Sequence, residues 1–268
     1  MKHKVNLFLV GAAKSGTTSL YKMFGQHPDI FVGVKKEPHF FAKDLFNPSK
    51  RYRQRLCLTQ EDYFKNYHNA NNEAYYLDAS VYYMYFEEVA QRLFDYNPEA
   101  KIIMILRSPI QRFYSHYKML RKEGVINTSL KDFIKHPIDN NGLNVLKMGE
   151  YQNAVQRFED LFENQCLILD FSELKHSEKV MDKICDFLNI EKIDNIRIEH
   201  ENKSGIPKSS WLAYLHMNFP LTIWLKSIMP KGKFRSFLGE SVLKTFYKDE
   251  PLDEAVELVL KEYYEKHP

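Results

Sequence analysis

Residues 5–20, with the sequence VNLFLVGAAKSGTTSL, constrain the fold of this chain more than any other segment. The apolar run Val5–Val10 predicts a buried strand. The segment Gly11–Thr18 interrupts this run, and apolar residues then follow at helical spacing, at Leu20, Tyr21, Met23 and Phe24. In a strand–loop–helix unit of this kind, backbone N–H groups line the loop and the positive end of the helix dipole faces an anion. The segment therefore predicts a phosphate-binding loop.

The loop is similar to a Walker A motif but differs from it in the place of the lysine. Gly11 and Gly16 have the G-x-x-x-x-G spacing, and we expect both to adopt backbone angles that a Cβ atom would forbid. A Walker A motif continues with Lys and then Ser or Thr, whereas this chain has Thr17 and Thr18 there and carries Lys14 inside the loop. From this motif alone, the alternative is an ordinary strand-to-helix turn with a solvated lysine.

A second apolar strand, Lys101–Leu106, ends in Arg107. A nucleotide kinase often ends such a strand in an aspartate that holds magnesium. A helix is predicted over 109–124, because proline suits its first position and glycine its end. Three residues of this helix share one face at three- and four-residue spacing, namely Arg112, Ser115 and His116. The pattern favours a second, metal-free phosphate site, although Arg107 and Ser115 taken alone would be surface or capping residues.

Four segments in this order give the chain a family resemblance. They are GAAKSGTTSL, KKEPHFF (Lys35–Phe41), LDASVYY (Leu77–Tyr83) and ILRSPIQRFYSHY (Ile105–Tyr117). The set resembles the sulfotransferases that use 3′-phosphoadenosine 5′-phosphosulfate (PAPS), in particular the heparan-sulfate-type branch and its bacterial relatives. The resemblance implies an α/β, P-loop NTPase-like, three-layer α/β/α fold with a central, mainly parallel sheet and extra C-terminal helices. We expect one sulfotransferase domain over 1–268, with a core at about 5–208 and a helical extension at 209–268.

The resemblance also implies a donor site for PAPS without a metal ion. Lys14 would neutralise the leaving 5′-phosphate oxygen, while Arg107 and Ser115 would hold the 3′-phosphate. The other loop residues assigned to the donor are Ala13, Ser15, Gly16, Thr17, Thr18 and Ser19. A later basic, glycine-containing loop would close over the 3′-phosphate through Lys203, Gly205 and Lys208, and its alternative is an ordinary exposed loop.

The segment KKEPHFF implies the catalytic base. In the family the glutamate of this motif takes the proton of the acceptor, so the resemblance assigns this role to Glu37. His39 would have a supporting catalytic role, and Lys36 would contact substrate. We expect Pro38 to hold Glu37 in an extended conformation at a strand end. Without the resemblance, Glu37 would be an exposed carboxylate paired with Lys35 or Lys36.

The acceptor side is implied by the segment LDASVYY. Asp78, Ser80 and Tyr83 match a family segment that lines the acceptor cleft. Some family members carry a lysine where this chain has Ala79 and a proline where it has Val81, which leaves the acceptor type open. The sequence favours a saccharide or glycolipid acceptor and leaves O- or N-sulfation and the oligomeric state undecided.

Composition places limits on partners and compartment. The chain has 268 residues with 44% hydrophobic residues, which suffices for a full core, and its net charge of +3 favours no nucleic-acid partner. The three cysteines show no metal-ligand spacing and fit a reducing compartment. The start of the chain leads directly into a core strand, and no run is apolar enough for a transmembrane helix. We expect a bacterial cytoplasmic protein, or a Golgi enzyme only if an N-terminal anchor is missing from this sequence.

Further patterns outline the rest of the chain. They predict strands at 30–34, 75–80 and 166–170, and helices at 87–96, 151–162, 180–188 and 252–264. The aromatic segment Trp211–Met229 favours buried helices over a membrane-surface contact. Two other functions stay open at this point, namely an atypical P-loop nucleotide kinase and a non-catalytic nucleotide- or glycan-binding domain. The kinase would need a Walker A lysine that this loop lacks.

Overall fold

A computed structural model describes residues 4–45, 53–54, 56–139, 141–196, 206–207, 247–248 and 251–268. Its centre is a five-stranded sheet in the order β2-β3-β1-β4-β5, in which every neighbouring pair is parallel. The strands are β1 (Leu7–Gly11), β2 (Ile30–Val32), β3 (Tyr75–Asp78), β4 (Lys101–Leu106) and β5 (Cys166–Asp170). All the strands predicted for this sheet are present, although β1 starts later than expected and β2 and β3 end earlier. Because the strands are parallel, their carboxyl ends meet at one edge of the sheet.

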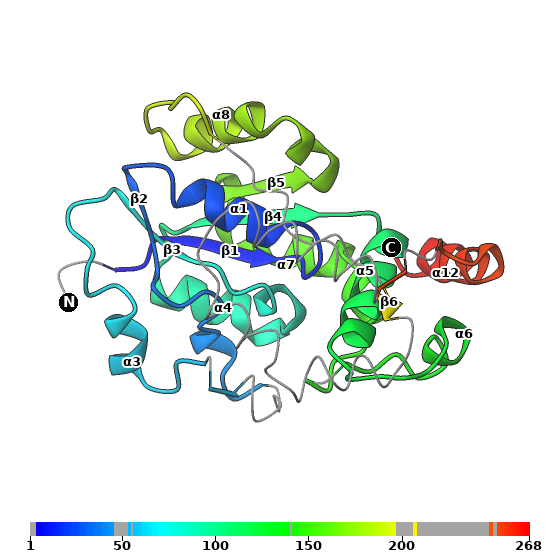
Figure 1. Cartoon of the computed structure of the whole chain (residues 1–268). Coiled ribbons are helices and arrows are strands. Elements are labelled where there is room, and N and C mark those ends of the chain that lie inside the picture. Colours follow the sequence, from blue (N-terminus) through cyan, green and yellow to red (C-terminus); the bar gives the residue numbers. More distant parts are fainter. Residues whose placement is uncertain are drawn as a thin grey trace, which may run out of the picture.

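Helices cover both faces of this sheet (Figure 1). On one face lie α1 (Thr17–Phe24) and α8 (Ser177–Leu188), and on the other lie α4 (Glu87–Tyr96) and α7 (Gln152–Phe162). Side chains of β1 alternate between the faces, because Leu7 and Leu9 pack with α1 and α8 whereas Phe8 and Val10 pack in the opposite cluster. The three-layer α/β/α fold implied by the sequence is therefore confirmed.

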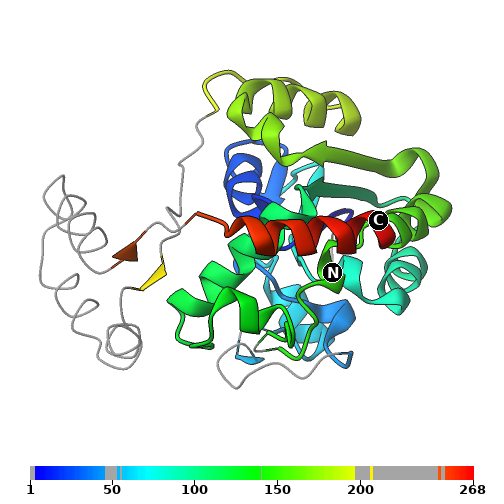
Figure 2. The same ribbon diagram turned by 90° about the vertical axis from the view of Figure 1, so that its right-hand side faces the viewer.

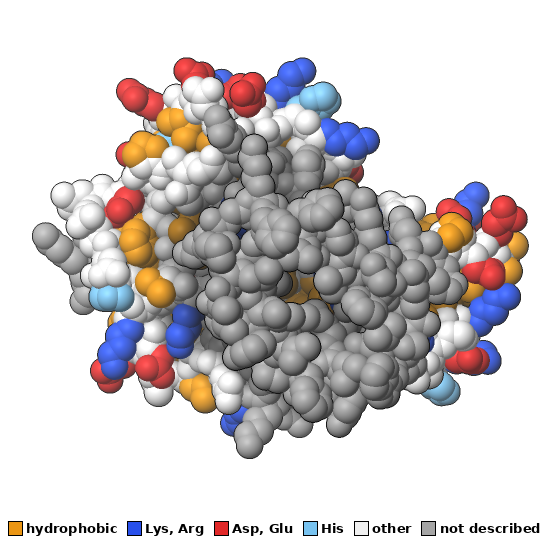
Figure 3. Space-filling model, in the orientation of Figure 1, with side chains coloured by type: hydrophobic (Ala, Val, Ile, Leu, Met, Phe, Trp, Pro, Cys, Tyr) orange, Lys and Arg blue, Asp and Glu red, His pale blue; other side chains and the backbone are white. Residues whose placement is uncertain are grey.

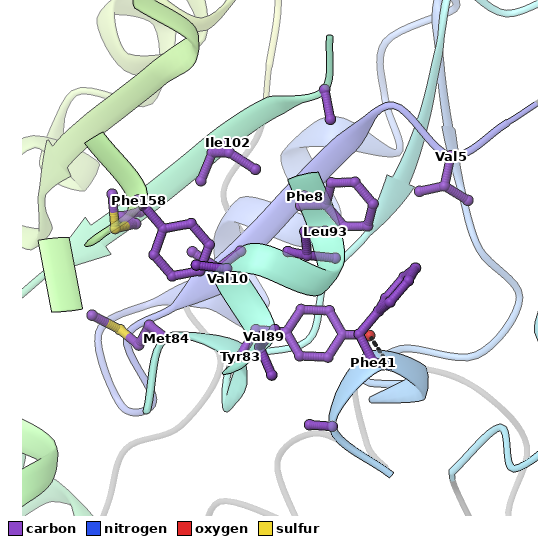
Figure 4. Packing of buried hydrophobic residues seen from close by; sticks show 14 of the residues in the cluster. Val5, Phe8, Val10, Phe41, Tyr83, Met84, Val89, Leu93, Ile102 and Phe158 are labelled. Atoms are coloured by element: carbon purple, nitrogen blue, oxygen red, sulfur yellow. Dashed lines mark hydrogen bonds between the residues drawn. The ribbon is translucent and has the colours of Figure 1, made fainter. Parts of the chain in front are cut away.

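The core under α4 and α7 is built largely of aromatic and branched side chains. Figure 4 shows Val10 of β1 close to Phe158 of α7, and Phe8 close to Leu93 of α4. Phe41 packs into the same cluster, with its ring centroid 5.9 Å from that of Phe8. This packing joins the segment after β2 to the central strand, and that segment carries the KKEPHFF motif.

A third core cluster lies at the carboxyl edge of the sheet. Here α5 (Pro109–Lys122) packs against α12 (Glu254–Lys266), the helix expected at 252–264. Both views place α12 beside α5 (Figures 1 and 2). The end of α5 is as predicted, because Gly124 has φ of +67°, a left-handed angle that suits glycine just beyond a helix.

Shorter elements complete the described part of the chain. They are α3 (Gln60–Lys65), α6 (Leu130–Phe133), 3₁₀ turns at Phe40–Ala42, Tyr83–Tyr85, Lys147–Gly149, Glu163–Gln165 and Phe171–Lys175, and the antiparallel pair β6 (Ile206–Pro207) and β7 (Tyr247–Lys248). Helix α6 was not predicted from the sequence. Its signal was Ser129, whose hydroxyl accepts from the Asp132 N–H as a helix cap.

The surface of the described residues carries charges of both signs. Figure 3 shows acidic and basic side chains interspersed over α8 and around α12, with apolar side chains between them on α12. Within those residues, no helix combines the length and the apolar character needed to cross a membrane. The segment Trp211–Met229, for which buried helices were expected, lies outside the described residues.

Candidate functional site

The first half of the glycine-bounded loop is tied down by its own backbone. The Ala12 N–H continues the sheet by donating to the Ile105 carbonyl at 2.8 Å, and the Ser15 N–H donates to the Ala12 carbonyl at 3.2 Å. The Ala13 N–H, predicted to contact the donor, donates to the Tyr85 hydroxyl at 2.9 Å. An incoming anion is therefore left with the N–H groups of the second half of the loop and the start of α1.

The two glycines of the loop are required for different reasons. Gly16 has φ of +88°, and a Cβ added there would lie 2.4 Å from Cδ1 of Leu174. Gly11 is not among the described glycines with positive φ, so the expectation of a forbidden backbone angle there was wrong. Its Cβ would instead lie 1.9 Å from the sulfur of Met84, so that the close approach of η2 (Tyr83–Tyr85) requires glycine.

The N-terminus of α1 opens onto this loop. Gly16 is the residue that precedes the helix, and it offers no side chain to cap the first turn. The first N–H groups of any α-helix lack partners within the helix, and here they belong to Thr17, Thr18 and Ser19. The side chain of Ser15 is fully buried beside them, and its hydroxyl has no hydrogen-bond partner among the described residues. Open N–H groups and a helix dipole form an anion site.

Lys14 brings a cation to this site in a partly buried position. Its φ is +69°, and its Nζ lies 3.3 Å from the sulfur of Met119 on α5. Burial lowers the pKa of Lys14, and the nearby carboxylates of Glu123 and Glu37 act in the opposite direction. The lysine of the loop and the carboxylate of the KKEPHFF motif are thus within electrostatic reach of one another, although 22 positions separate them in the sequence.

Arg107, which was expected to belong to a second phosphate site, lies against the same loop. Its NH1 donates to the Lys14 carbonyl at 3.4 Å, and its guanidinium lies 4.4 Å from the centroid of the Phe171 ring. Ser115 is partly exposed two turns into α5. The buried Arg112 approaches His116 on this helix, with NH1 3.4 Å from Nδ1, which agrees with the predicted common face.

Tyr151 is a residue of this site that the sequence analysis missed. Burial raises the pKa of the Tyr151 hydroxyl, and the nearby Ser15 hydroxyl and the backbone of Arg107 act in the opposite direction. Neither the Tyr151 nor the Ser15 hydroxyl meets hydrogen-bond geometry with another described residue. Tyr151 precedes α7, so we had interpreted it as part of the apolar face of that helix. No pattern in the sequence separated it from the core residues.

Glu37 lies in a turn that differs from the expected extended conformation. Its φ is +63°, so the expectation based on Pro38 was wrong. Tertiary hydrogen bonds outweigh the local preference, because the Glu37 N–H donates to the Ala79 carbonyl at 3.1 Å and the Pro38 carbonyl accepts from the Cys57 N–H at 2.9 Å. The Glu37 carboxylate accepts from the Lys36 ammonium at 2.6 Å, and these side chains are 19% and 23% exposed respectively. The ion pair can therefore be reached from solvent.

His39 lies behind Glu37 in the protein interior. Its side chain is fully buried, and its ring stacks on Tyr82 with centroids 5.2 Å apart. Burial lowers the pKa of His39 to about 4, with Glu37 acting in the opposite direction. His39 is therefore neutral at pH 7 and can donate or accept a hydrogen bond without carrying charge.

Asp78, Ser80 and Tyr83 were expected to line the acceptor cleft, but the structure places all three in the interior with 0% exposure. Asp78 accepts from the hydroxyls of Ser80 at 2.5 Å, Tyr83 at 2.9 Å and Tyr63 at 3.0 Å. Burial raises its pKa to about 6, although these hydrogen bonds oppose the shift. The Ser80 hydroxyl also accepts from the His39 N–H at 3.0 Å. The network therefore supports the turn of Glu37 and His39 from behind.

The structure thus brings together the loop, Arg107, Glu37 and His39 at the carboxyl edge of one sheet. The three residues predicted to close over the donor, Lys203, Gly205 and Lys208, lie outside the described residues.

Comparisons with known proteins agree with this arrangement. A family model described as a sulfotransferase domain matches residues 4–208. A bifunctional heparan sulfate N-deacetylase/N-sulfotransferase 1 from Homo sapiens is 26% identical over 258 residues, which are 92% of this chain and 29% of that protein. The membrane-associated sulfotransferase kil1 of Dictyostelium discoideum is 31% identical over 112 residues, or 42% of this chain and 22% of that protein. The chain spans less than a third of the length of these curated relatives.

A solved structure supports the same conclusion. The crystal structure of a sulfotransferase from Alicyclobacillus acidocaldarius superposes with a TM-score of 0.68 at 26% identity, over 84% of this chain and 92% of that chain. The family model covers well over half of the sequence, including the loop, Glu37 and Arg107. This chain belongs to the sulfotransferase family.

Proposed function

We propose that the chain transfers the sulfuryl group of PAPS to a hydroxyl or amine of a carbohydrate-like acceptor. The proposal rests on one observation. The glycine-bounded loop, which suits an anion, lies close to the carboxylate of Glu37 at the carboxyl edge of the sheet. Lys14 of that loop and Glu37 interact electrostatically, and Arg107 donates to the Lys14 carbonyl. A nucleotide-binding domain without catalytic activity would have no need of Glu37 in this position.

The residues present fit a donor with phosphates at two positions. Thr17, Thr18 and Ser19 offer the unpaired N–H groups of α1 to the 5′-phosphate, and the buried Ser15 hydroxyl adjoins them. Arg107 and Ser115 would hold the 3′-phosphate, which distinguishes PAPS from ATP. The donor supplies the activated sulfuryl group, and the chain supplies binding, orientation and proton transfer.

The chemical step follows from the charges around this site. Glu37 takes the proton of the acceptor hydroxyl while the acceptor oxygen forms its bond to sulfur. Lys14 neutralises the charge that develops on the 5′-phosphate oxygen as the bond from that oxygen to sulfur breaks. The Lys36 ammonium contacts Glu37 Oε1 in the free protein, and the second oxygen of the carboxylate is the one that would take the proton. Neutral His39 supports Glu37 from the buried side without adding a competing charge.

A saccharide is the acceptor class that the relatives favour. Two of the proteins similar to this chain are named for heparan sulfate N-sulfotransferase activity, one from Homo sapiens and one from Mus musculus. The partly exposed Lys36 and Glu37 present charges of both signs to solvent, which suits hydroxyl-rich acceptors. We propose that a sugar hydroxyl or amine approaches Glu37 from the solvent side of this pair.

Calorimetric titration with adenosine 3′,5′-bisphosphate, run beside ADP with magnesium, tests the donor assignment. We expect metal-independent binding of the bisphosphate, at least tenfold weaker in Arg107→Ala. Lys65→Ala serves as a control, because this lysine pairs with Glu61 at 2.7 Å on α3 and both side chains are mostly exposed. A preference for ADP with magnesium would instead support the kinase alternative and contradict the proposal.

A further inference from the structure

The family model matches residues 4–208, and α12 lies beyond them. This helix nevertheless packs on α5, the helix that carries Ser115. Its residues Val256, Leu260 and Tyr264 are buried in one cluster with Phe113 and Tyr117 of α5. Figure 2 shows α12 in red running across the front of α5 and ending near the green segment that leads into α7. The other face of α12 is exposed, with Leu258 at 58% and Val259 at 51%.

The end of α12 holds the short segment 146–152 on both sides of Tyr151. The Tyr264 hydroxyl donates to the Leu146 carbonyl at 2.9 Å, and the Tyr263 hydroxyl donates to Oε1 of Glu150 at 2.5 Å. Beyond Tyr151, the Gln152 N–H donates to the Pro268 carbonyl at 3.4 Å. The segment also has no room to move inward, because a Cβ at Gly149 would lie 2.7 Å from the Tyr264 ring.

The residue at the centre of these contacts reaches the donor loop. The Tyr151 hydroxyl is buried beside the Ser15 hydroxyl and the backbone of Arg107. Just before the segment, the buried Arg112 of α5 donates to the Val145 carbonyl. The segment is thus fixed by α5 at its beginning and by α12 along the rest of its length, and it presents Tyr151 to the loop.

We infer that α12 is a positioning element of the donor site, which holds Tyr151 against Ser15 and Arg107. The inference rests on the proposed function of this loop as the PAPS site. Residues 146–151 contain only one short 3₁₀ turn, Lys147–Gly149, and the Tyr151 carbonyl accepts from the Val155 N–H of α7 at 2.8 Å. The contacts of α12 add support on the side of Tyr151 that α7 does not hold. A loop already held in its binding conformation loses less conformational entropy when the donor binds, and its affinity is correspondingly higher.

The first experiment compares Tyr263→Phe with Tyr264→Phe, each of which removes one hydroxyl and keeps the ring. Titration with adenosine 3′,5′-bisphosphate, at a temperature where each variant is fully folded, is expected to show roughly fivefold weaker binding per lost hydrogen bond. Leu258→Ala and Val259→Ala are matched controls on the exposed face of the same helix and should bind as the wild type does. Glu150→Gln retains an acceptor for Tyr263 and should largely preserve affinity, whereas Glu150→Ala should not.

A double-mutant cycle separates positioning from a general loss of stability. If α12 acts through Tyr151, then Tyr264→Phe weakens binding in the wild-type background but has little further effect in a Tyr151→Phe background. Fully additive effects, or unchanged affinity in both tyrosine variants of α12, would overturn the inference.

Amide hydrogen exchange of residues 12–19 in the free protein provides a readout without ligand. The inference requires faster exchange in Tyr263→Phe and Tyr264→Phe than in the Leu258→Ala control, and equal exchange rates would overturn it. Failure of the wild type to bind the bisphosphate would contradict the proposed function, while the exchange rates would still decide whether α12 holds the loop.

Discussion

At the scale of single residues, the site depends on three residues whose backbone is in the left-handed region. Lys14, Glu37 and His39 have φ values of +69°, +63° and +45° respectively. Such angles are uncommon for residues other than glycine and persist only where surrounding contacts hold them. Here the contacts are hydrogen bonds from Glu37 to Ala79 and from His39 to Ser80. These conformations bring a lysine and a carboxylate from two separate loops within electrostatic reach of one another.

The assignment of Glu37 as the base predicts a separation between turnover and binding. Glu37→Gln keeps the shape of the side chain and removes its ability to accept a proton. We expect sulfuryl transfer to fall by roughly 10²- to 10⁴-fold, while the affinity for adenosine 3′,5′-bisphosphate changes little. The exposed Glu88→Gln provides the matched control. Wild-type turnover in Glu37→Gln would contradict the assignment.

Burial of His39 predicts a dependence of stability on pH. Its pKa is about 4 in the folded protein against an ordinary value of 6.5, so the unfolded chain takes up a proton first as the pH falls. The free energy of unfolding therefore decreases between about pH 6.5 and pH 4, by about 3 kcal/mol from this residue. In His39→Phe this loss should be absent. Urea unfolding of both proteins at pH 7 and pH 4.5 measures the difference.

Asp78 contributes in the opposite direction within the same range. Its pKa is raised to about 6 from 3.8, so the folded protein binds the proton first and gains stability as the pH falls through this interval. The two residues partly cancel in the wild type, and the His39→Phe variant should become more stable toward acid relative to the wild type. If the difference in free energy of unfolding between the wild type and His39→Phe is the same at both pH values, a neutral buried His39 is ruled out.

At the scale of elements, the junction of β1 and α1 determines whether the anion site forms. Gly16 combines φ of +88° with a packed environment, because its Cβ would lie 2.4 Å from Leu174. Gly142 has φ of +80°, but its Cβ would meet no described atom within 4 Å. Alanine substitutions at Gly16 and Gly142 therefore separate two contributions to the free energy of unfolding, namely the cost of the backbone angle and the cost of steric overlap.

We expect Gly142→Ala to lower the free energy of unfolding by about 1 kcal/mol, since only the left-handed angle is affected. Gly16→Ala should cost about 2–4 kcal/mol, because overpacking adds to the same backbone cost. Chemical denaturation measures both. Titration of the folded Gly16→Ala variant with adenosine 3′,5′-bisphosphate should also show weaker binding, whereas Gly142→Ala should bind as the wild type does. Equal destabilisation of the two variants would contradict the packing argument.

At the scale of the whole molecule, two apolar layers hold a parallel sheet whose edge carries the site. Phe158 of α7 is fully buried in the cluster that also contains Phe8 and Phe41. Phe158→Ala leaves a cavity in this layer and should lower the free energy of unfolding by about 3–5 kcal/mol. Leu258→Ala, on the exposed face of α12, should change it by less than about 0.5 kcal/mol. Urea unfolding provides the measurement, and comparable effects of the two substitutions would contradict this description of the core.

The sequence by itself determined the order of the strands along the chain, the glycine-bounded loop between β1 and α1, and the position of most helices. These follow from local physics, because apolar periodicity reports which faces are buried and glycine reports where a side chain cannot fit. The strand ending in Arg107 and the helix after it were predicted for the same reason. The resemblance then supplied the roles of Lys14 and Glu37, which no pattern of spacing contains.

The tertiary structure alone decided how these parts face one another. The extended conformation expected at Glu37 was overridden by two hydrogen bonds to distant residues. The Glu37 N–H donates to the Ala79 carbonyl, and the Pro38 carbonyl accepts from the Cys57 N–H. Gly11 is required by the approach of Met84, and Asp78 is buried by the hydroxyls that surround it. The contact of Tyr151 with Ser15 and its support by α12 join residues more than 100 positions apart. Such contacts depend on how the elements pack against one another. The hydrophobic periodicity of a single segment does not predict that packing.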